Sequence, residues 1–227
     1  MADSVVVFSG GMDSTVLLAA LIHEKKRVHA LSFDYGSRHN KREIECARAF
    51  CRENSVEHTI ITLPFVNDLF KSSLLQSGTE VPDGSYMEEN MKSTVVPFRN
   101  GIMLSIAAGL AESVGAAEVA IASHSGDHFI YPDCRPDFNH AFAQAVLLGT
   151  GGKVRVKFPF AGMDKRAIGD MGRELGVDFA ATWTCYKGGD IHCGTCGACD
   201  ERKYALGFSS GFDPTSYSIP DNEIDNP

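Results

Sequence analysis

The sequence predicts an α/β protein built on a parallel, five-stranded sheet with helices on both faces and a small zinc-binding segment near the C-terminus. Two patterns carry this prediction. Short β-branched and apolar runs alternate with longer stretches of helical character, the arrangement that right-handed crossovers between parallel strands produce. Four cysteines also gather between positions 185 and 199, a density typical of a metal site.

The first strand and the first helix flank a glycine turn. Residues 4–8 are a β-branched apolar run, and residues 16–22 are apolar enough for a buried helix. The turn between them reads Ser9-Gly10-Gly11-Met12-Asp13-Ser14-Thr15. Its glycines allow a tight turn with N–H groups facing a ligand, and the helix N-terminus adds the positive end of its dipole. The turn therefore predicts a phosphate-binding loop, with an ordinary helix-capping turn as the alternative.

The next strand-helix units continue the alternation. Residues 27–33 read as a second strand that ends in Asp34-Tyr35-Gly36, and an amphipathic helix is expected from about His39 to Glu53. Residues 58–63 form a third strand, which Pro64 ends. From about 71 to 94 the periodicity is lost in a long polar stretch. Such stretches are usually functional lids or disordered, so we expect a mobile cover over the nucleotide or plain disorder.

The second half of the chain returns to the same alternation. The expected elements are a helix over 102–114, a strand over 118–122, a polar loop over 123–135, a helix over 138–148, a strand over 154–158 and a helix capped by Asp164 that runs to about 175. Ligands of open parallel sheets sit beyond the carboxyl ends of the strands. The glycine turn, residues 34–36, Arg99 and the 123–135 loop are therefore expected to line one cleft.

The cysteine cluster indicates a metal site. Cys193, Cys196 and Cys199 follow the spacing C-x-x-C-x-x-C, and Cys185 precedes them. Tetrahedral zinc takes four thiolates or imidazoles, and this spacing lets neighbouring ligands share one turn. Three alternatives stay open: His192 as the fourth ligand, an iron–sulfur cluster in place of zinc, and inert buried thiols. Four protein ligands close the site, so its expected role is structural.

Composition limits the class of protein. A chain of 227 residues suffices for one sizeable domain or a domain with a small appendage. The formal net charge of −8 argues against nucleic acid as a partner. No apolar run approaches the roughly 20 residues that span a bilayer, and nothing at the N-terminus suggests a signal peptide. We therefore expect a cytoplasmic protein without membrane contact, whose seven cysteines serve metal binding or catalysis rather than disulfides.

The type of phosphate loop narrows the chemistry. A Walker loop would end in Gly-Lys-Ser/Thr, but this loop contains no lysine, and a dinucleotide fingerprint would need a third glycine near Ser14. The loop resembles instead the Ser-Gly-Gly-x-Asp-Ser loop of the ATP pyrophosphatases, also called PP-loop enzymes. These enzymes cut ATP between its α and β phosphates and adenylate a substrate oxygen. The resemblance implies a Rossmann-like fold.

Further motifs resemble one family in particular, the 7-cyano-7-deazaguanine synthases, or QueC family, of queuosine biosynthesis. They are the phosphate loop, Asp34-Tyr35-Gly36-Ser37-Arg38-His39, Val96-Pro97-Phe98-Arg99-Asn100, Tyr131-Pro132-Asp133-Cys134-Arg135-Pro136 and the four cysteines. The resemblance runs from Ser4 to about Arg202. It departs at Ser37, where the family is expected to have glutamine, so no role is assigned to that side chain.

The resemblance implies a reaction in which 7-carboxy-7-deazaguanine, ammonia and ATP give the nitrile through an adenylate and an amide, in a homodimeric enzyme. The residues expected to bind ATP are Phe8, Ser9, Gly10, Gly11, Met12, Asp13, Ser14, Thr15, Phe33, Arg99 and Lys165. Those expected to act in catalysis are Asp13, Ser14, Arg99 and Lys165, with Asp13 as a ligand of Mg²⁺. The substrate is expected to contact Tyr35, Arg38, His39, His124, Asp127, Tyr131, Asp133 and Arg135. Zinc is expected at Cys185, Cys193, Cys196 and Cys199.

Two other functions compete with this one. An adenylating sulfurtransferase would use the same loop, but would want an RNA-binding surface and a persulfide-forming cysteine. A nucleotide-binding zinc module that was redirected to another carboxylate would keep the same binding residues. In each case we expect an ATP-binding domain over 1–180, a zinc segment over 181–208 and a polar tail over 209–227.

Overall fold

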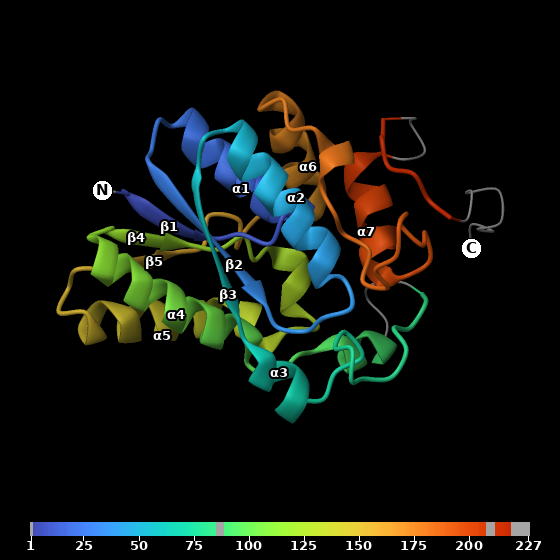
Figure 1. Cartoon of the computed structure of the whole chain (residues 1–227), viewed down its shortest axis with the longest axis horizontal. Coiled ribbons are helices and arrows are strands. Elements are labelled where there is room, and N and C mark those ends of the chain that lie inside the picture. The colour runs from blue at the N-terminus through green and yellow to red at the C-terminus, as the bar shows by residue number, and fades with distance from the viewer. Residues whose placement is uncertain (1, 85–88, 208–211, 219–227) are drawn as a thin grey trace.

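The computed structural model describes residues 2–84, 89–207 and 212–218 (Figure 1). Its centre is a five-stranded sheet in which all paired strands are parallel, in the order β3-β2-β1-β4-β5. The strands are β1 (Ser4–Val7), β2 (Val28–Asp34), β3 (Glu57–Thr62), β4 (Glu118–Ala120) and β5 (Arg155–Lys157). The prediction of a five-stranded parallel sheet is confirmed.

Helices cover both faces of this sheet, also as predicted. They are α1 (Met12–His23), α2 (Asn40–Glu53), α3 (Pro64–Leu69), α4 (Arg99–Val114), α5 (Pro136–Gly149), α6 (Lys165–Glu174) and α7 (Gly197–Leu206), with short 3-10 helices η1 (Glu89–Thr94), η2 (Ser125–His128), η3 (Pro132–Cys134) and η4 (Phe179–Ala181). In Figure 1, α1 and α2 lie above the sheet, while α4 and α5 lie below it.

The apolar runs form the central strands because these strands are buried on both faces. All four residues of β1 are buried, and β1 pairs with β2 on one side and with β4 on the other. One core packs α4 against the sheet, and a second core packs α1 against its opposite face. The strand order reverses at β1, so the gap between β1 and β4 is the switch point at which such sheets bind ligands.

The polar stretch over 71–94 is packed where the structure describes it, which differs from the expected mobile cover or disorder. Leu74, Leu75 and Met91 are fully buried. Arg38 holds the stretch to the body, because its guanidinium donates to the carbonyl oxygens of Ser73 and Gly78 at 3.2 and 2.8 Å. Residues 85–88 of this prediction lie outside the described residues.

One helical run of the described chain, Met91–Val114, is long and apolar enough to cross a membrane, contrary to the expectation that no run would be. Most of this run is α4, which packs on β1 and β4. Leu104, Ala107 and Ala111 of α4 are fully buried in that contact. The apolar residues of α4 therefore cover the sheet, as expected for the core helix of an α/β protein.

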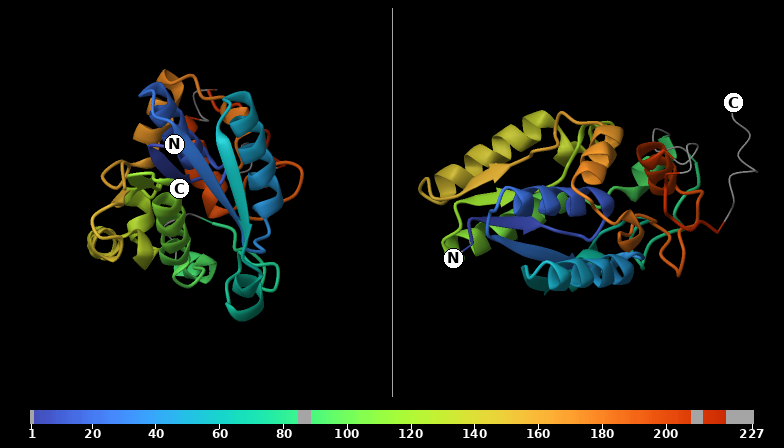
Figure 2. Two further views of the ribbon diagram at one scale, coloured as in Figure 1. Left: turned by 60° about the vertical axis from the view of Figure 1, so that its left-hand side comes forward. Right: turned by 90° about the horizontal axis from the view of Figure 1, so that it is seen from above.

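The segment that contains the cysteines lies beyond the carboxyl ends of the strands. In the right-hand view of Figure 2 the orange and red part of the chain lies at the end of the molecule opposite the N-terminus. α7 packs on α6, and the fully buried Arg202 of α7 donates hydrogen bonds to Thr182 and Thr184. It also donates to Thr215 at 2.7 Å, so the described part of the expected polar tail packs against α7.

Candidate active site and metal centre

A cavity of about 200 Å³ opens at the carboxyl ends of β1, β2 and β4. Thirteen of the residues that the sequence predicts as ATP or substrate contacts line it: Phe8, Ser9, Gly11, Met12, Asp13, Ser14, Phe33, Tyr35, His39, Arg99, Asp127, Tyr131 and Lys165. The predicted cleft is thus one cavity, with the glycine turn at one side and Arg99 and the tyrosines at another.

The glycine turn is held open by its own hydroxyls. The Ser9 hydroxyl accepts from the Gly11 N–H at 3.0 Å and lies 3.1 Å from the Ser14 hydroxyl. Ser14 and Thr15 both donate to the Gly11 carbonyl oxygen, at 3.2 and 2.8 Å. In the described chain, Gly11 is the N-cap of α1 and no side chain caps this helix, so its first-turn N–H groups are available to an anion.

Gly10 is needed for packing rather than for contact with a ligand. Its φ is +87°, and a Cβ on it would lie 2.2 Å from the carbonyl oxygen of Glu43 and 2.7 Å from the amide nitrogen of Ala47. Gly10 therefore lets α2 press directly on the phosphate loop, although it does not line the cavity.

Lys165, at the start of α6, lies in a buried cluster of charges beneath the loop. Its ammonium group is 2.6 Å from a carboxylate oxygen of Asp13, 3.0 Å from one of Glu201 and 3.3 Å from Nε2 of His124. Burial alone would lower the pKa of Lys165, but the carboxylates of Asp13, Glu201 and Asp127 outweigh it and raise that pKa. The cluster thus holds a permanent cation beside the anion-binding turn.

Asp13 also offers a free oxygen to a cation. Its Oδ2 binds Lys165, while its Oδ1 is buried and has no hydrogen-bond partner in the described chain. A buried carboxylate oxygen without a partner is costly unless a ligand completes it. Mg²⁺ prefers carboxylate and phosphate oxygens, so this oxygen fits the predicted magnesium ligand.

The opposite side of the cavity combines a cation with tyrosines. The Arg99 guanidinium donates to the Tyr35 hydroxyl at 3.1 Å, and its Cζ lies 5.8 Å from the centre of the Tyr35 ring. The Tyr131 hydroxyl lies 2.9 Å from that of Thr94 and 3.4 Å from that of Tyr186. Such a wall can bind a flat ring between aromatic side chains and place a carboxylate beside the guanidinium.

Several predicted site residues make other contacts and are absent from the described cavity wall. Arg135 donates to the His128 carbonyl oxygen at 2.9 Å, and Asp133 accepts from the Asn100 N–H at 2.8 Å, so it caps α4. Arg38 binds the 71–84 segment, as described above. His124 is fully buried beneath Lys165, where its Nδ1 accepts from the Gly126 N–H at 3.1 Å.

The cavity also contains residues that the sequence analysis missed. They include Glu43 on α2, Trp183, Thr184 and Tyr186 on either side of Cys185, and Ala198 and Glu201 on α7. Burial raises the pKa of Glu43 to about 8, against the smaller opposing effects of Arg99 and the Ser9 hydroxyl. The signal for Glu43 was its place on the helix that follows Asp34-Tyr35-Gly36, one turn after His39.

The raised pKa of Glu43 predicts a pH-dependent stability. Between an unfolded-state pKa near 4.5 and the folded-state value near 8, only the folded protein keeps this proton, so stability falls as the pH rises. Glu43→Gln removes this effect. In thermal melts, we expect the midpoint of the variant minus that of the wild type to increase as the pH rises from 5 to 9. A midpoint difference that is constant over this range would contradict the assignment.

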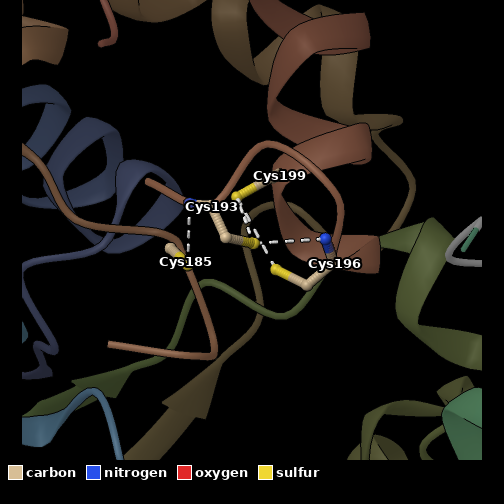
Figure 3. A group of neighbouring side chains, drawn as sticks. All are labelled: Cys185, Cys193, Cys196 and Cys199. Carbon is tan, nitrogen blue, oxygen red and sulfur yellow. Dashed lines mark hydrogen bonds between the residues drawn. The ribbon is translucent and has the colours of Figure 1, made fainter. Parts of the chain in front are cut away.

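The four cysteines converge as the sequence predicts (Figure 3). Their sulfur atoms all lie within 4.8 Å of one another, and Sγ of Cys199 is 3.8 Å from that of Cys193 and 3.6 Å from that of Cys196. Zinc–sulfur bonds of about 2.3 Å in a tetrahedron separate the sulfurs by about 3.8 Å. The cluster therefore has the size of a tetrahedral zinc site and can bind such a metal.

Backbone N–H groups favour the thiolate form of two of these cysteines, Cys185 and Cys193. The N–H groups of Thr195 and Cys196 donate to Sγ of Cys193 at 3.4 and 3.3 Å, and the Cys193 N–H donates to Sγ of Cys185 at 3.4 Å. His192, the alternative fourth ligand, faces elsewhere: it stacks on Trp183 at 4.3 Å, and its Nε2 accepts from the Thr184 N–H at 3.1 Å. The described cluster thus consists of the four cysteines.

The metal centre and the cavity share one segment of chain. Trp183, Thr184 and Tyr186 surround the ligand Cys185, and Glu201 follows the ligand Cys199 by two residues on α7. The Lys187 ammonium and the Thr195 hydroxyl both bind the Asp83 carboxylate, which connects the cysteine loop to the 71–84 segment. The cysteine cluster therefore positions part of the cavity wall.

Comparison with known proteins identifies the relatives of this chain. The family model described as "Queuosine biosynthesis protein QueC" matches residues 3–209. The 7-cyano-7-deazaguanine synthase of Desulfotalea psychrophila is 64% identical over 96% of this chain and 100% of its own length. That of Porphyromonas gingivalis strain ATCC 33277 is 53% identical over 95% of this chain and 97% of its own length.

A solved structure is similar in fold alone. The NMN synthetase of Francisella tularensis is 13% identical and superposes with a TM-score of 0.51, over 95% of this chain and 80% of that one. The match over nearly the whole chain, together with the cavity and the cysteine cluster, leads to one assignment. This protein belongs to the QueC family.

Proposed function

We propose that this protein uses ATP to convert 7-carboxy-7-deazaguanine and ammonia into 7-cyano-7-deazaguanine. The proposal takes its product from the names of the relatives and its substrates from the resemblance to the QueC family. The observation that supports it best is the single cavity that joins the uncapped N-terminus of α1 to Arg99 and its tyrosines. Such a cavity can bring the α-phosphate of ATP and the carboxylate of a flat heterocycle together.

The first step is adenylation of the carboxylate. A carboxylate oxygen attacks the α-phosphorus, the bond to the bridging oxygen of the β-phosphate breaks, and pyrophosphate leaves. The uncapped N–H groups of the first turn of α1 and the ammonium of Lys165 would stabilise the charge on that leaving group. Arg99 orients the carboxylate, and Tyr35, His39, Asp127 and Tyr131 contact the ring.

The second stage forms the carbon–nitrogen triple bond of the nitrile. Ammonia attacks the acyl adenylate and AMP leaves, which gives the amide. A second ATP adenylates the amide oxygen and releases pyrophosphate, and AMP then leaves as the nitrogen loses its protons. The same loop serves both adenylations, because each places an oxygen nucleophile opposite a departing pyrophosphate.

Two metals complete the proposal. Mg²⁺ would be held by the free carboxylate oxygen of Asp13 and would neutralise phosphate charge. Zinc would be held by the four cysteines and would stabilise the segment that carries Tyr186 and Glu201.

We further propose, from family membership and the net charge of −8, a cytoplasmic homodimer that needs no nucleic acid. Light scattering after size-exclusion chromatography tests the dimer.

Product analysis tests the function. With 7-carboxy-7-deazaguanine, ATP, Mg²⁺ and ammonium, we expect the nitrile, with AMP and pyrophosphate as nucleotide products. The amide should accumulate transiently and, when supplied alone with ATP, should be converted without ammonia. Formation of ADP alone would show that the loop does not cut ATP between its α and β phosphates.

Incorporation of sulfur instead of nitrogen would establish the sulfurtransferase alternative. The only described cysteine on the cavity wall outside the metal segment is Cys134. Burial raises the pKa of its thiol, and the Asn100 amide lies 3.1 Å from its sulfur. A thiol that stays protonated is a poor persulfide carrier, which favours ammonia as the nucleophile.

A further inference from the structure

Glu43 is a carboxylate on the cavity wall that the steps above leave without a role. Its side chain is only 15% exposed, and it lies on α2 where this helix presses on Gly10. The contact between Gly10 and the Glu43 carbonyl oxygen fixes the backbone of Glu43 against the phosphate loop. The position of its carboxylate is therefore set by the same turn that would position ATP.

The carboxylate itself reaches the beginning of the loop. It hydrogen-bonds the Ser9 hydroxyl, and its Oε1 would lie 3.5 Å from a Cβ placed on Gly11. Gly11 is the N-cap of α1, where the phosphates are proposed to bind. Glu43 thus borders the place where the substrate carboxylate becomes adenylated and where its carbon later accepts nitrogen.

The surroundings of Glu43 suit a group that gains and loses a proton. The titratable and charged groups that face it are His39 and Cys46 on α2 and Arg99 on α4. Burial lowers the pKa of His39 to about 3, so this ring is neutral although its Nε2 lies 3.6 Å from the carboxylate. Among the described residues no Lys or Arg nitrogen lies within ion-pair distance of Glu43, and burial raises the pKa of Glu43 to about 8.

The proposed reaction needs such a group at the nitrogen. Ammonia is mostly the ammonium ion at neutral pH and must give up one proton before it can attack and a second as the neutral amide forms. The amide nitrogen must then lose two more protons as the nitrile forms. Transfer of such protons to a positioned side chain typically accelerates a reaction about 10²–10⁴-fold.

We propose that Glu43 is the general base that takes protons from the nitrogen during amide and nitrile formation. This rests on the proposed function. In the first half, the carboxylate takes one proton from ammonium. The nitrogen lone pair then forms the bond to carbon while AMP leaves with the electrons of its bond, and the carboxylate takes a second proton from the bound nitrogen to give the neutral amide. In the second half, it takes two protons in turn from the nitrogen of the adenylated amide. Removal of the first gives the neutral imidate, and the electrons of the second N–H bond become the third bond to carbon as AMP departs with the electrons of its carbon–oxygen bond. Each proton passes to solvent before the next is taken.

The test separates adenylation from nitrogen chemistry in Glu43→Gln. Adenylation needs no base, so the variant should keep carboxylate-dependent exchange of pyrophosphate into ATP within about threefold of the wild type. Turnover of the amide to the nitrile should fall about 10²–10⁴-fold in kcat with little change in KM. In the wild type this turnover should rise with pH up to about 8, and the variant should lack that rise.

The matched control is Glu45→Gln, since Glu45 is an exposed glutamate on the same helix that pairs with Arg42. It should leave both activities unchanged. Glu43→Gln with full nitrile formation would overturn the proposal. A variant whose only defect is a raised KM for the deazaguanine would also overturn it, because Glu43 would then bind the substrate. So would a variant that loses pyrophosphate exchange into ATP as much as it loses amide turnover. The wild type could form no nitrile and still exchange pyrophosphate into ATP in the presence of another carboxylate. In that case the proposed function fails, but the placement of Glu43 beside the loop does not.

Discussion

Replacing Cys196 with serine is expected to abolish carboxylate-dependent pyrophosphate release as well as to destabilise the protein. A structural zinc site binds its metal with an apparent free energy of about 10–16 kcal/mol, which is folding free energy for the segment around it. That segment supplies Trp183, Tyr186 and Glu201 to the cavity wall. Loss of the metal should therefore displace both the tyrosine wall and the partner of Lys165.

Three measurements on one preparation check this expectation. Elemental analysis should find about one zinc per wild-type chain and none in Cys196→Ser, whose thermal midpoint should be lower and whose pyrophosphate release should be undetectable. The matched control is Cys51→Ser, which changes a buried cysteine of α2 outside the cluster and should keep its metal and its activity. Iron with a visible absorption band would overturn the zinc assignment. A metal-free variant with wild-type pyrophosphate release would show that the cluster does not support the cavity.

The strands were predictable because each lies in a short stretch of β-branched and apolar residues between turn residues, although β3 and β5 also contain charged residues. The helices that the sequence analysis missed, α3 and α7, lack a clear apolar pattern that would separate them from the neighbouring turns. Pro64 was interpreted only as the end of a strand, yet proline is also favoured in the first turn of a helix, and α3 begins with it. Of the ten residues of α7, one is glycine, one is cysteine and four are charged. The sequence of this helix therefore shows no apolar periodicity.

The candidate site was predictable where its residues are adjacent in sequence. The turn over 9–15 folds as expected for a phosphate loop because its hydroxyls and backbone groups hydrogen-bond within the turn. Glu43 had a signal in its place on the helix after Asp34-Tyr35-Gly36, but its position on the cavity wall, like that of Glu201, depends on how α2 and α7 pack. Arg38 and Arg135 were expected at the substrate from the resemblance to the QueC family; in the structure both donate to backbone carbonyl oxygens instead.

Lys165→Met is expected to reduce pyrophosphate release about 10²–10³-fold, the effect of removing one preorganised donor from a developing negative charge. The loss should appear in kcat, because the charge that Lys165 stabilises grows only as pyrophosphate departs. The variant should also unfold more easily at neutral pH, since it leaves the carboxylates of Asp13 and Glu201 buried without their cation. Breaking a buried pair in this way costs about 3–5 kcal/mol. Lys157→Met, at an exposed lysine of β5, is the matched control and should change neither property.

A second substitution separates the two effects. Glu201→Gln in the Lys165→Met background removes one of the stranded charges, so it should recover part of the lost stability in chemical denaturation. It should recover none of the pyrophosphate release, because the ammonium that faces the leaving group is still missing. If the double variant regained activity along with stability, Lys165 would act only through folding. A Lys165→Met protein with unchanged kcat would remove this residue from the chemistry altogether.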